Sequence, residues 1–174
     1  KPLAQEIDET ERFPMETVEK LGKFGMMGVP IPREMGGQGC DSLTYVMLVD
    51  ELSRVCGTTG VIVSAHTSLC CEPIRKFGTK EQQEKYLPDL CSGKKIGAFC
   101  LTEPGAGTDA SGQQTKAVLD GDHYVLNGSK IFITNGGVAD VFIVFAMTDK
   151  SLGTKGISAF IVEKSFPGFS VGTL

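Results

Sequence analysis

The sequence has no long hydrophobic run and no concentration of positive charge. Its longest uncharged stretch, Val55 to Cys71, is broken by glycine, serine, threonine and His66, so it is too short and too polar to span a bilayer. The 17 lysine and arginine residues are scattered among 21 acidic residues, and the net charge is −4. Binding to nucleic acid would need a basic patch or stripe. We therefore expect no membrane span and no nucleic-acid partner.

Metal-binding and disulfide patterns are also missing. The six cysteines include no CxxC pair, and the two histidines do not stand at ligand spacing from them. In a chain of 174 residues this distribution is typical of reduced, mostly buried thiols in the cytoplasm. We therefore expect no metal site, no disulfide framework and a cytoplasmic protein.

The residues before Lys95 lack strand-like alternation and have helical periodicity instead. One helix is expected from Pro14 to Phe24, with the proline at its first position. A second helix is expected to follow Asp41 or Ser42, either of which can cap its first turn, and to reach Val55. The buried stripe of this second helix is expected to contain Tyr45, Leu48, Val49, Leu52 and Val55.

Two more helices are expected in this half of the chain. The segment from Val61 to about Ile74 is apolar nearly all round, so we expect it in the middle of a helical layer, kinked or shortened at Pro73. The T-x-x-Q pattern that begins at Thr79 is that of a capping box, and it predicts a short polar helix ending at a Ser-Gly pair. Residues 1–95 are thus expected to form an all-α domain.

Strand-length runs and hairpin dipeptides replace this pattern from Ile96 onward. Asp120-Gly121 and Asn127-Gly128 are both typical hairpin turns. The runs around and after them predict strands at residues 115–119, 123–126, 130–134, 141–147 and 156–162. The fold class is therefore expected to be α+β, with an antiparallel, barrel-like β-domain at residues 96–174. No closing strand is evident, so we expect this domain to be incomplete.

Two stretches of the second half have the character of ligand-binding loops. Residues 97–111 (GAFCLTEPGAGTDAS) and 129–137 (SKIFITNGG) each hold a short apolar run that ends in a threonine, Thr102 or Thr134, and then breaks into turn residues. The proline and glycines of the first stretch leave backbone N–H groups open to an anion. Together the stretches predict a phosphate-bearing, partly planar ligand held between two strand ends.

The glycine-rich loop has two other interpretations. Gly105, Gly107 and Ala110 fit the GxGxxA pattern of dinucleotide-binding folds, but hairpins follow in place of the helix that such a fold requires. The loop could also be a turn that binds nothing. The longer strings around it decide between these alternatives.

Those strings resemble the acyl-CoA dehydrogenase family. LTEPGAGTDASGQQT, LNGSKIFITNGGVAD and FAMTDKSLGTKGISAFIVEK resemble the family's middle domain almost without gaps, and VCGTTGVIVSAHTSLC and FGTKEQQEKYLPDL resemble its N-terminal helical domain. The resemblance covers essentially the whole chain and is strongest to the short-chain, butyryl-CoA type of anaerobic bacteria. It implies a helical N-terminal domain, a β-barrel-like middle domain and a C-terminal four-helix bundle, the last of which lies outside these residues.

The resemblance also implies FAD as cofactor and assigns residues to it. Residues 99–108 would follow the flavin and its pyrophosphate, with the Leu101 backbone and Thr102 at the pyrimidine edge. Residues 132–134 would make the second contact, with the Thr134 hydroxyl donating to flavin N5. Where many relatives have Trp or Tyr, this chain has phenylalanine, which keeps an apolar plane but loses the polar groups. The implied cofactor residues are Phe99, Cys100, Leu101, Thr102, Gly107, Thr108, Phe132, Ile133 and Thr134.

The implied reaction is α,β-desaturation of a short-chain acyl-CoA, such as butyryl-CoA to crotonyl-CoA, with hydride transfer to flavin N5. The substrate would contact Thr108 and the helical residues Val61, Ala65 and Leu69, which share a face; a plain core role for these three is an equal alternative. The family's catalytic base is a glutamate beyond Leu174. No residue of this chain is therefore assigned as catalytic, and the chain alone is expected to be inactive.

Two titratable residues near these segments are expected to be structural. Glu103 lies in the flavin loop, but the base of the family lies elsewhere; His66 has no acidic or nucleophilic companion. The resemblance further implies an electron-transferring flavoprotein as partner and a homotetramer. The alternatives are a non-catalytic acyl-CoA or flavin-binding module, and an acyl-CoA oxidase-like flavoprotein of the same fold.

Overall fold

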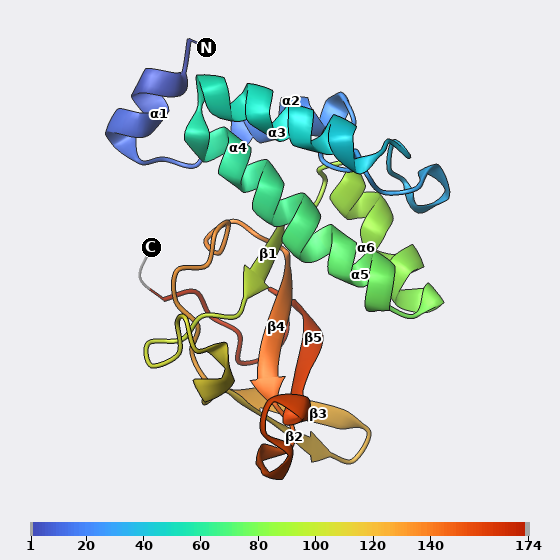
Figure 1. Ribbon diagram of the computed structural model, residues 1–174, viewed down its shortest axis with the longest axis vertical. Helices are drawn as coiled ribbons and strands as arrows, with labels where there is room; N and C mark the ends of the chain where they lie inside the picture. The colour runs from blue at the N-terminus through green and yellow to red at the C-terminus, as the bar shows by residue number, and fades with distance from the viewer. Residues whose placement is uncertain (1, 173–174) are drawn as a thin grey trace. The chain divides into compact units, whose positions relative to one another are not determined.

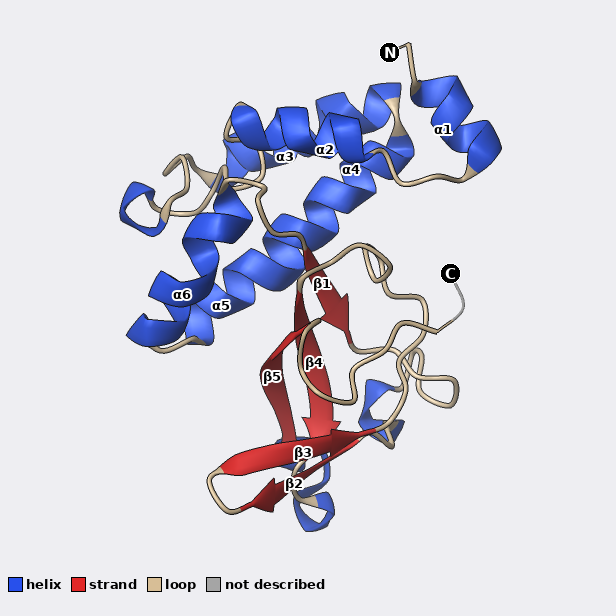
Figure 2. Ribbon diagram, turned by 180° about the vertical axis from the view of Figure 1, so that it is seen from behind, coloured by secondary structure: helices blue, strands red, loops and turns tan. Residues whose placement is uncertain are grey.

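The computed structural model describes residues 2–172 and divides into two compact units, one ending at Gly97 and the other beginning at Ala98. Helices build the first unit, and a β-sheet with connecting loops builds the second (Figure 1, Figure 2). This order confirms the expected succession of a helical domain and a sheet-containing domain.

The first unit contains six α-helices, a short 3₁₀ turn and a π-helical segment among its described residues. They are α1 (Ala4–Thr10), α2 (Met15–Lys23), the 3₁₀ turn (Arg33–Met35), α3 (Ser42–Val55), α4 (Gly57–Ser64), the π-helix (Ala65–Cys71), α5 (Glu72–Phe77) and α6 (Lys80–Cys91). Their core is apolar and includes the fully buried Val18, Met27, Ile31, Val63, Ile74, Leu87 and Leu90.

The helix starts follow the predicted capping residues closely. The Asp41 carboxylate accepts a hydrogen bond from the Thr44 N–H at 2.8 Å and caps α3. At α6, both halves of the predicted capping box are present, because Thr79 and Gln82 each accept from the other's backbone N–H. The first position of α2 was predicted wrongly. Pro14 has a ψ of 67°, outside the helical range, so the helix begins at Met15.

The predicted burial of α3 was also wrong. Tyr45, Leu48, Val49 and Leu52 are only half-buried, and Val55 is exposed. The reason is that α3 packs mainly on a single neighbour, α4, where the Tyr45 hydroxyl donates to the Ser64 carbonyl at 3.3 Å. A helix covered on one side by one partner buries only a narrow strip of its surface.

The helix predicted from Val61 to about Ile74 is longer than expected and contains a wide turn. It runs without interruption from Gly57 to Phe77, and within its π-helical part the Glu72 N–H donates to the Thr67 carbonyl five residues earlier. Pro73 has no N–H to donate to the carbonyl four residues before it, so the α-helical pattern is broken just ahead of the proline. The helix is not buried all round, because Val61 and Leu69 are 54% and 40% exposed.

The second unit is built on a five-stranded sheet. Its strands are β1 (Gly97–Cys100), β2 (Lys116–Asp120), β3 (His123–Asn127), β4 (Val141–Met147) and β5 (Ile157–Glu163), with 3₁₀ turns at Ala110–Gly112 and Lys150–Gly156. β4 is the central strand, hydrogen-bonded to β1, β2 and β5. Its sequence VFIVFA is almost continuously apolar, and consecutive residues are buried, so both faces of the strand are covered. β2–β3 and β4–β5 are antiparallel as predicted, whereas β2 and β4 are joined by one parallel pair.

The predicted hairpin turn at Asp120-Gly121 is confirmed, and the one at Asn127-Gly128 is wrong. β2 and β3 pair from Lys116–Asn127 to Asp120–His123, with Gly121 at a φ of +63° in the turn. Asn127-Gly128, by contrast, is not a hairpin turn. An added Cβ at Gly128 would lie 2.3 Å from the Thr115 hydroxyl, so the glycine permits close contact between two chain segments. The strand predicted at residues 130–134 does not form, and this segment is a loop.

Candidate functional site

The two stretches singled out in the sequence lie against each other in the second unit. The Ile131 N–H donates to the Thr102 carbonyl at 2.9 Å, and the Lys130 ammonium donates to the Leu101 carbonyl at 3.0 Å. The structure therefore places the predicted flavin residues 101–108 and 132–134 on two adjoining loops, with Phe99 and Cys100 at the end of β1. The predicted geometry is correct for the first loop, which follows β1, and wrong for the second, which follows no strand end.

The first loop has a tight turn at its tip. Glu103 and Ala106 exchange backbone hydrogen bonds of 3.1 and 3.0 Å around Pro104 and Gly105. Beyond the turn, the Asp109 carboxylate accepts from the Ser111 N–H at 3.1 Å and fixes a short 3₁₀ turn. No heavy atom lies within 4 Å of an added Cβ at Gly105 or Gly107, so the backbone there is open to an approaching ligand.

The second loop holds an aromatic ring in the open. Phe132 has a φ of +56°, a region that bulky residues rarely adopt, and it is 89% exposed. The backbone turns immediately afterwards, where the Gly136 N–H donates to the Ile133 carbonyl at 2.9 Å. Such backbone strain is common where a segment is shaped for a ligand, and an exposed aromatic ring offers that ligand an apolar plane.

Three hydroxyls of the predicted site have no internal partner. Thr108 and Thr134 are exposed and Thr102 is half-buried, and none of their hydroxyls forms a hydrogen bond within residues 2–172. Together with the open glycine backbone and the Phe132 ring, they match a flat ligand that carries hydrogen-bonding edges and an anionic group. FAD has these features, so the residues present fit this cofactor.

Two of the predicted cofactor residues, Phe99 and Cys100, have side chains that pack inside the second unit instead of facing solvent. Phe99 is half-buried and packs edge-on against Phe145, with ring centroids 5.1 Å apart. Cys100 is buried, and burial raises the pKa of its thiol to about 12. Only the backbone of Cys100 can therefore face a ligand.

The predicted substrate residues of the helical unit differ in exposure. Val61 and Leu69 are 54% and 40% exposed, whereas Ala65 is buried. Large apolar side chains in the open are not explained by a plain core role, the alternative interpretation of this helix. Their role in holding an acyl chain remains a prediction.

His66 and Glu103 are fully engaged in structural contacts, as predicted. The His66 ring is buried; its Nδ1 accepts from the Gly97 N–H at 2.9 Å, and its Nε2 faces the Leu90 carbonyl at 3.2 Å. Burial lowers the pKa of His66 to about 4, so the ring is neutral near pH 7. The Glu103 carboxylate accepts from the backbone N–H groups of Gln114 and Thr115 and from Lys130.

Sequence reasoning missed Lys130 as a site residue. Its ammonium lies beneath the first loop and reaches the Leu101 carbonyl, the Glu103 carboxylate and the Gln113 amide oxygen. The only signal was a lysine that directly precedes the apolar run from Ile131 to Ile133. That pattern is equally typical of a solvated strand face.

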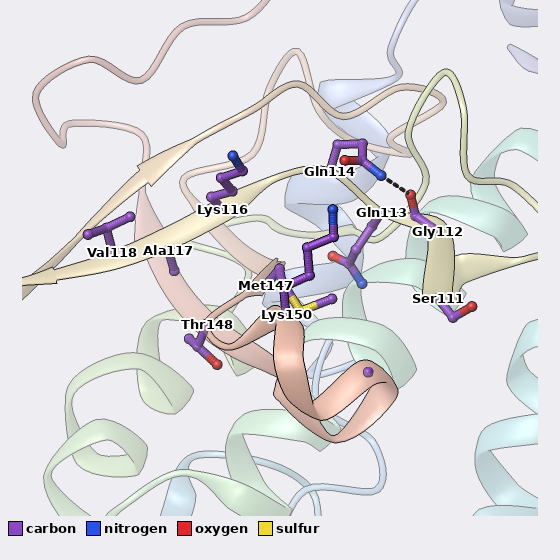
Figure 3. Close-up of a pocket in the computed structure, with 11 residues that line it drawn as sticks. Ser111, Gly112, Gln113, Gln114, Lys116, Ala117, Val118, Met147, Thr148 and Lys150 are labelled. Atoms are coloured by element: carbon purple, nitrogen blue, oxygen red, sulfur yellow. Dashed lines mark hydrogen bonds between the residues drawn. The ribbon is translucent and has the colours of Figure 1, made fainter.

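A separate pocket of about 500 Å³ lies beside the first loop (Figure 3). It is lined by Ser111 to Gln114, by β2 and by the end of β4, and the side chains of Lys116 and Lys150 extend in the same direction in this view. None of the nine predicted flavin residues lines it.

Within residues 2–172, no group of three or more His, Cys, Asp or Glu side chains could hold a metal ion. No helix in that range is long and apolar enough to cross a membrane.

Comparison with known proteins gives matches along nearly the whole chain. Residues 1–94 match the family model of the acyl-CoA dehydrogenase N-terminal domain, and residues 98–174 match that of the acyl-CoA dehydrogenase middle domain. The chain is 68% identical over 172 residues to the short-chain specific acyl-CoA dehydrogenase of Clostridium acetobutylicum, covering 99% of this chain and 45% of that protein.

Solved structures give the same result. A chain from a structure described as the electron transferring flavoprotein of Acidaminococcus fermentans is 55% identical, with a TM-score of 0.96 over 99% of this chain and 45% of that one. Butyryl-CoA dehydrogenase from Megasphaera elsdenii is 50% identical, with a TM-score of 0.92 over 97% of this chain and 45% of its own. The chain thus spans less than half the length of these relatives.

Proposed function

The chain belongs to the acyl-CoA dehydrogenase family, and we propose that it forms the flavin-facing part of an enzyme that desaturates short-chain acyl-CoA thioesters. The observation that carries this proposal is the junction of the two loops. The Thr102 carbonyl and the Ile131 N–H join them at 2.9 Å, and the Thr102, Thr108 and Thr134 hydroxyls of the two loops form no hydrogen bond among residues 2–172.

The residues of the two loops would hold FAD, which when bound supplies the two-electron acceptor of the reaction. The Phe132 ring would provide an apolar wall beside the flavin plane, and Thr102 and Thr134 would donate hydrogen bonds at its edges. The open backbone at Gly105 and Gly107 would receive the pyrophosphate. Each of these roles uses a group that the fold leaves exposed or, at Thr102, half-buried.

The residues of the helical unit would hold the acyl chain. Val61 and Leu69 expose apolar side chains, and the bulk of Val61 suits a short chain such as butyryl. Thr108 would contact the thioester. His66 and Glu103 are not available as the base, because each is tied up by hydrogen bonds to the backbone. From the family resemblance, we propose that the α-proton is taken by a glutamate outside this chain.

Further parts of the proposal come from the relatives. The A. fermentans structure is described as an electron transferring flavoprotein, and we propose such a flavoprotein as the electron acceptor of this enzyme. A homotetramer is proposed from the family resemblance alone. All six cysteines are free thiols, which supports a cytoplasmic location.

The test is anaerobic addition of butyryl-CoA to the FAD-loaded protein while the oxidised flavin absorbance is followed. The chain is prepared alone and as a fusion with the part of the C. acetobutylicum enzyme that it does not span. We expect bleaching in the fusion and none in the chain alone. Palmitoyl-CoA is the chain-length control and should bleach the fusion more slowly. A folded, flavin-loaded fusion that does not bleach would contradict the proposed function, and bleaching by the chain alone would show that a base lies within it.

A further inference from the structure

Lys130 is a buried cation in the second unit. Its side chain is 9% exposed, and its partner Glu103 is 5% exposed. The ammonium donates to Glu103 Oε1 at 2.8 Å, to the Leu101 carbonyl at 3.0 Å and to Gln113 Oε1 at 3.2 Å. A lysine ammonium has three N–H donors, so these three acceptors use them all. Its position beside the Leu101 carbonyl is therefore fixed.

The countercharge, the Glu103 carboxylate, is held in place by backbone hydrogen bonds. Glu103 accepts from the N–H groups of Gln114 and Thr115 in addition to Lys130. Burial alone would raise the pKa of Glu103, but these hydrogen bonds outweigh it and lower the pKa to about 2. The carboxylate thus stays ionised, and the pair forms a fixed dipole with its positive end at the Leu101 carbonyl.

The Leu101 carbonyl and the Thr102 N–H belong to the same peptide group. A cation on the carbonyl oxygen polarises that group and makes its N–H a stronger donor. Among residues 2–172 the Thr102 N–H has no acceptor, while the carbonyl of Thr102 is held by Ile131. The polarised N–H is therefore free for a ligand, at the position assigned to the edge of the flavin.

We propose that Lys130 is a positioning residue that raises the electron affinity of the bound flavin by orienting and polarising the Leu101–Thr102 peptide. The inference rests on the proposed function, since it requires FAD at the two loops. Two-electron reduction adds negative charge to the flavin, and a stronger donor at its edge stabilises that charge. A purely structural Lys130 would tie the loops together without affecting this equilibrium.

The test is the flavin midpoint potential of the FAD-loaded fusion described above, measured by anaerobic reduction against a reference dye. Lys130→Met should shift the oxidised-to-reduced ratio at least tenfold toward oxidised, about 30 mV for a two-electron couple. Glu103→Gln leaves the cation and should shift the ratio in the opposite direction. Lys130→Arg should stay within about threefold of the unaltered protein, because it keeps a cation that can reach the Leu101 carbonyl.

Two further variants keep the test decisive if a single charge left buried prevents folding. The double variant Lys130→Met with Glu103→Gln removes both charges and should still favour the oxidised flavin. Lys116→Met is the matched control, an exposed lysine of the same unit, and should leave the potential unchanged. If Lys130→Met and Glu103→Gln shift the potential in the same direction, or if Lys130→Met and the double variant bind FAD with no shift, the inference is overturned and the proposed function stands. Failure of the unaltered protein to bind FAD would overturn both.

Discussion

The buried ring of His66 should make the protein less stable as the pH falls from about 7 to about 5. The ring has no exposed surface, and its Nδ1 accepts a hydrogen bond from the Gly97 N–H, which requires that nitrogen to be unprotonated. Burial lowers the pKa from 6.5 to about 4, with a smaller opposing effect from the Leu90 carbonyl. A charged imidazolium would lose its hydration in this position.

The direction follows from the protons bound in each state. Between a pKa of 6.5 in the unfolded chain and about 4 in the folded one, the unfolded chain binds more protons, so acid favours unfolding. The free energy of unfolding should be about 2 kcal/mol smaller at pH 5 than at pH 7. Buried carboxylates add little in this interval, since the folded pKa of Glu103 is about 2 and its loss of stability comes at lower pH.

The measurement is urea unfolding followed by far-UV circular dichroism, which reports mainly on the helical unit. His66→Asn removes the titrating group, so the variant should be less stable at neutral pH but should lose little further stability toward pH 5. His123→Asn replaces an exposed histidine and leaves the His66 contacts intact, so it should keep the slope of the unaltered protein. An unaltered protein equally stable at both pH values, or an equal loss in His66→Asn, would refute this account of the ring.

Three other outcomes follow from local geometry. Gly128→Ala should lower the free energy of unfolding by about 1–3 kcal/mol, because the new Cβ would overlap the Thr115 side chain. Thr79→Ala should cost about 1 kcal/mol in thermal or urea unfolding by removing one half of the capping box. Iodoacetamide should modify the exposed Cys40 rapidly and the buried Cys100 hardly at all in the folded protein, as peptide mass spectrometry can show.

Each of these three predictions can be compared with a matched variant or residue of the same chain. Gly105→Ala places a Cβ with no heavy atom within 4 Å and should leave stability unchanged. Thr79→Ser keeps the capping hydroxyl and should behave like the unaltered protein. A Gly128→Ala variant of full stability would mean that this glycine does not serve close contact. Fast modification of Cys100 would mean that its strand opens readily.

The elements that could be predicted are those whose causes are local in sequence. The caps at Asp41 and Thr79 depend on residues three positions apart, and both formed. The β2–β3 hairpin depends on the turn at Gly121 and on the runs beside it. The almost continuous apolar sequence of β4 is typical of a strand that is buried on both faces.

The errors occurred where distant residues decide the conformation. The segment around Phe132 has the composition of a strand, but its contact with Thr102, about thirty positions earlier, holds it as a loop. Nothing near Gly128 in the sequence reveals the proximity of Thr115. Lys130 belongs to the same class, because its three acceptors come from two other segments of the chain. Tertiary contacts override local propensity in each case.

The central claim is that the two joined loops form the FAD site, and FAD titration with Phe132→Ala is its most direct test. The ring is 89% exposed, so its removal should leave the unfolding midpoint unchanged. We expect saturable FAD binding by the unaltered protein, weakened at least about tenfold in the variant, which corresponds to about 1.4 kcal/mol. Equal affinity in the two proteins, or no saturable binding in the unaltered one, would contradict the account.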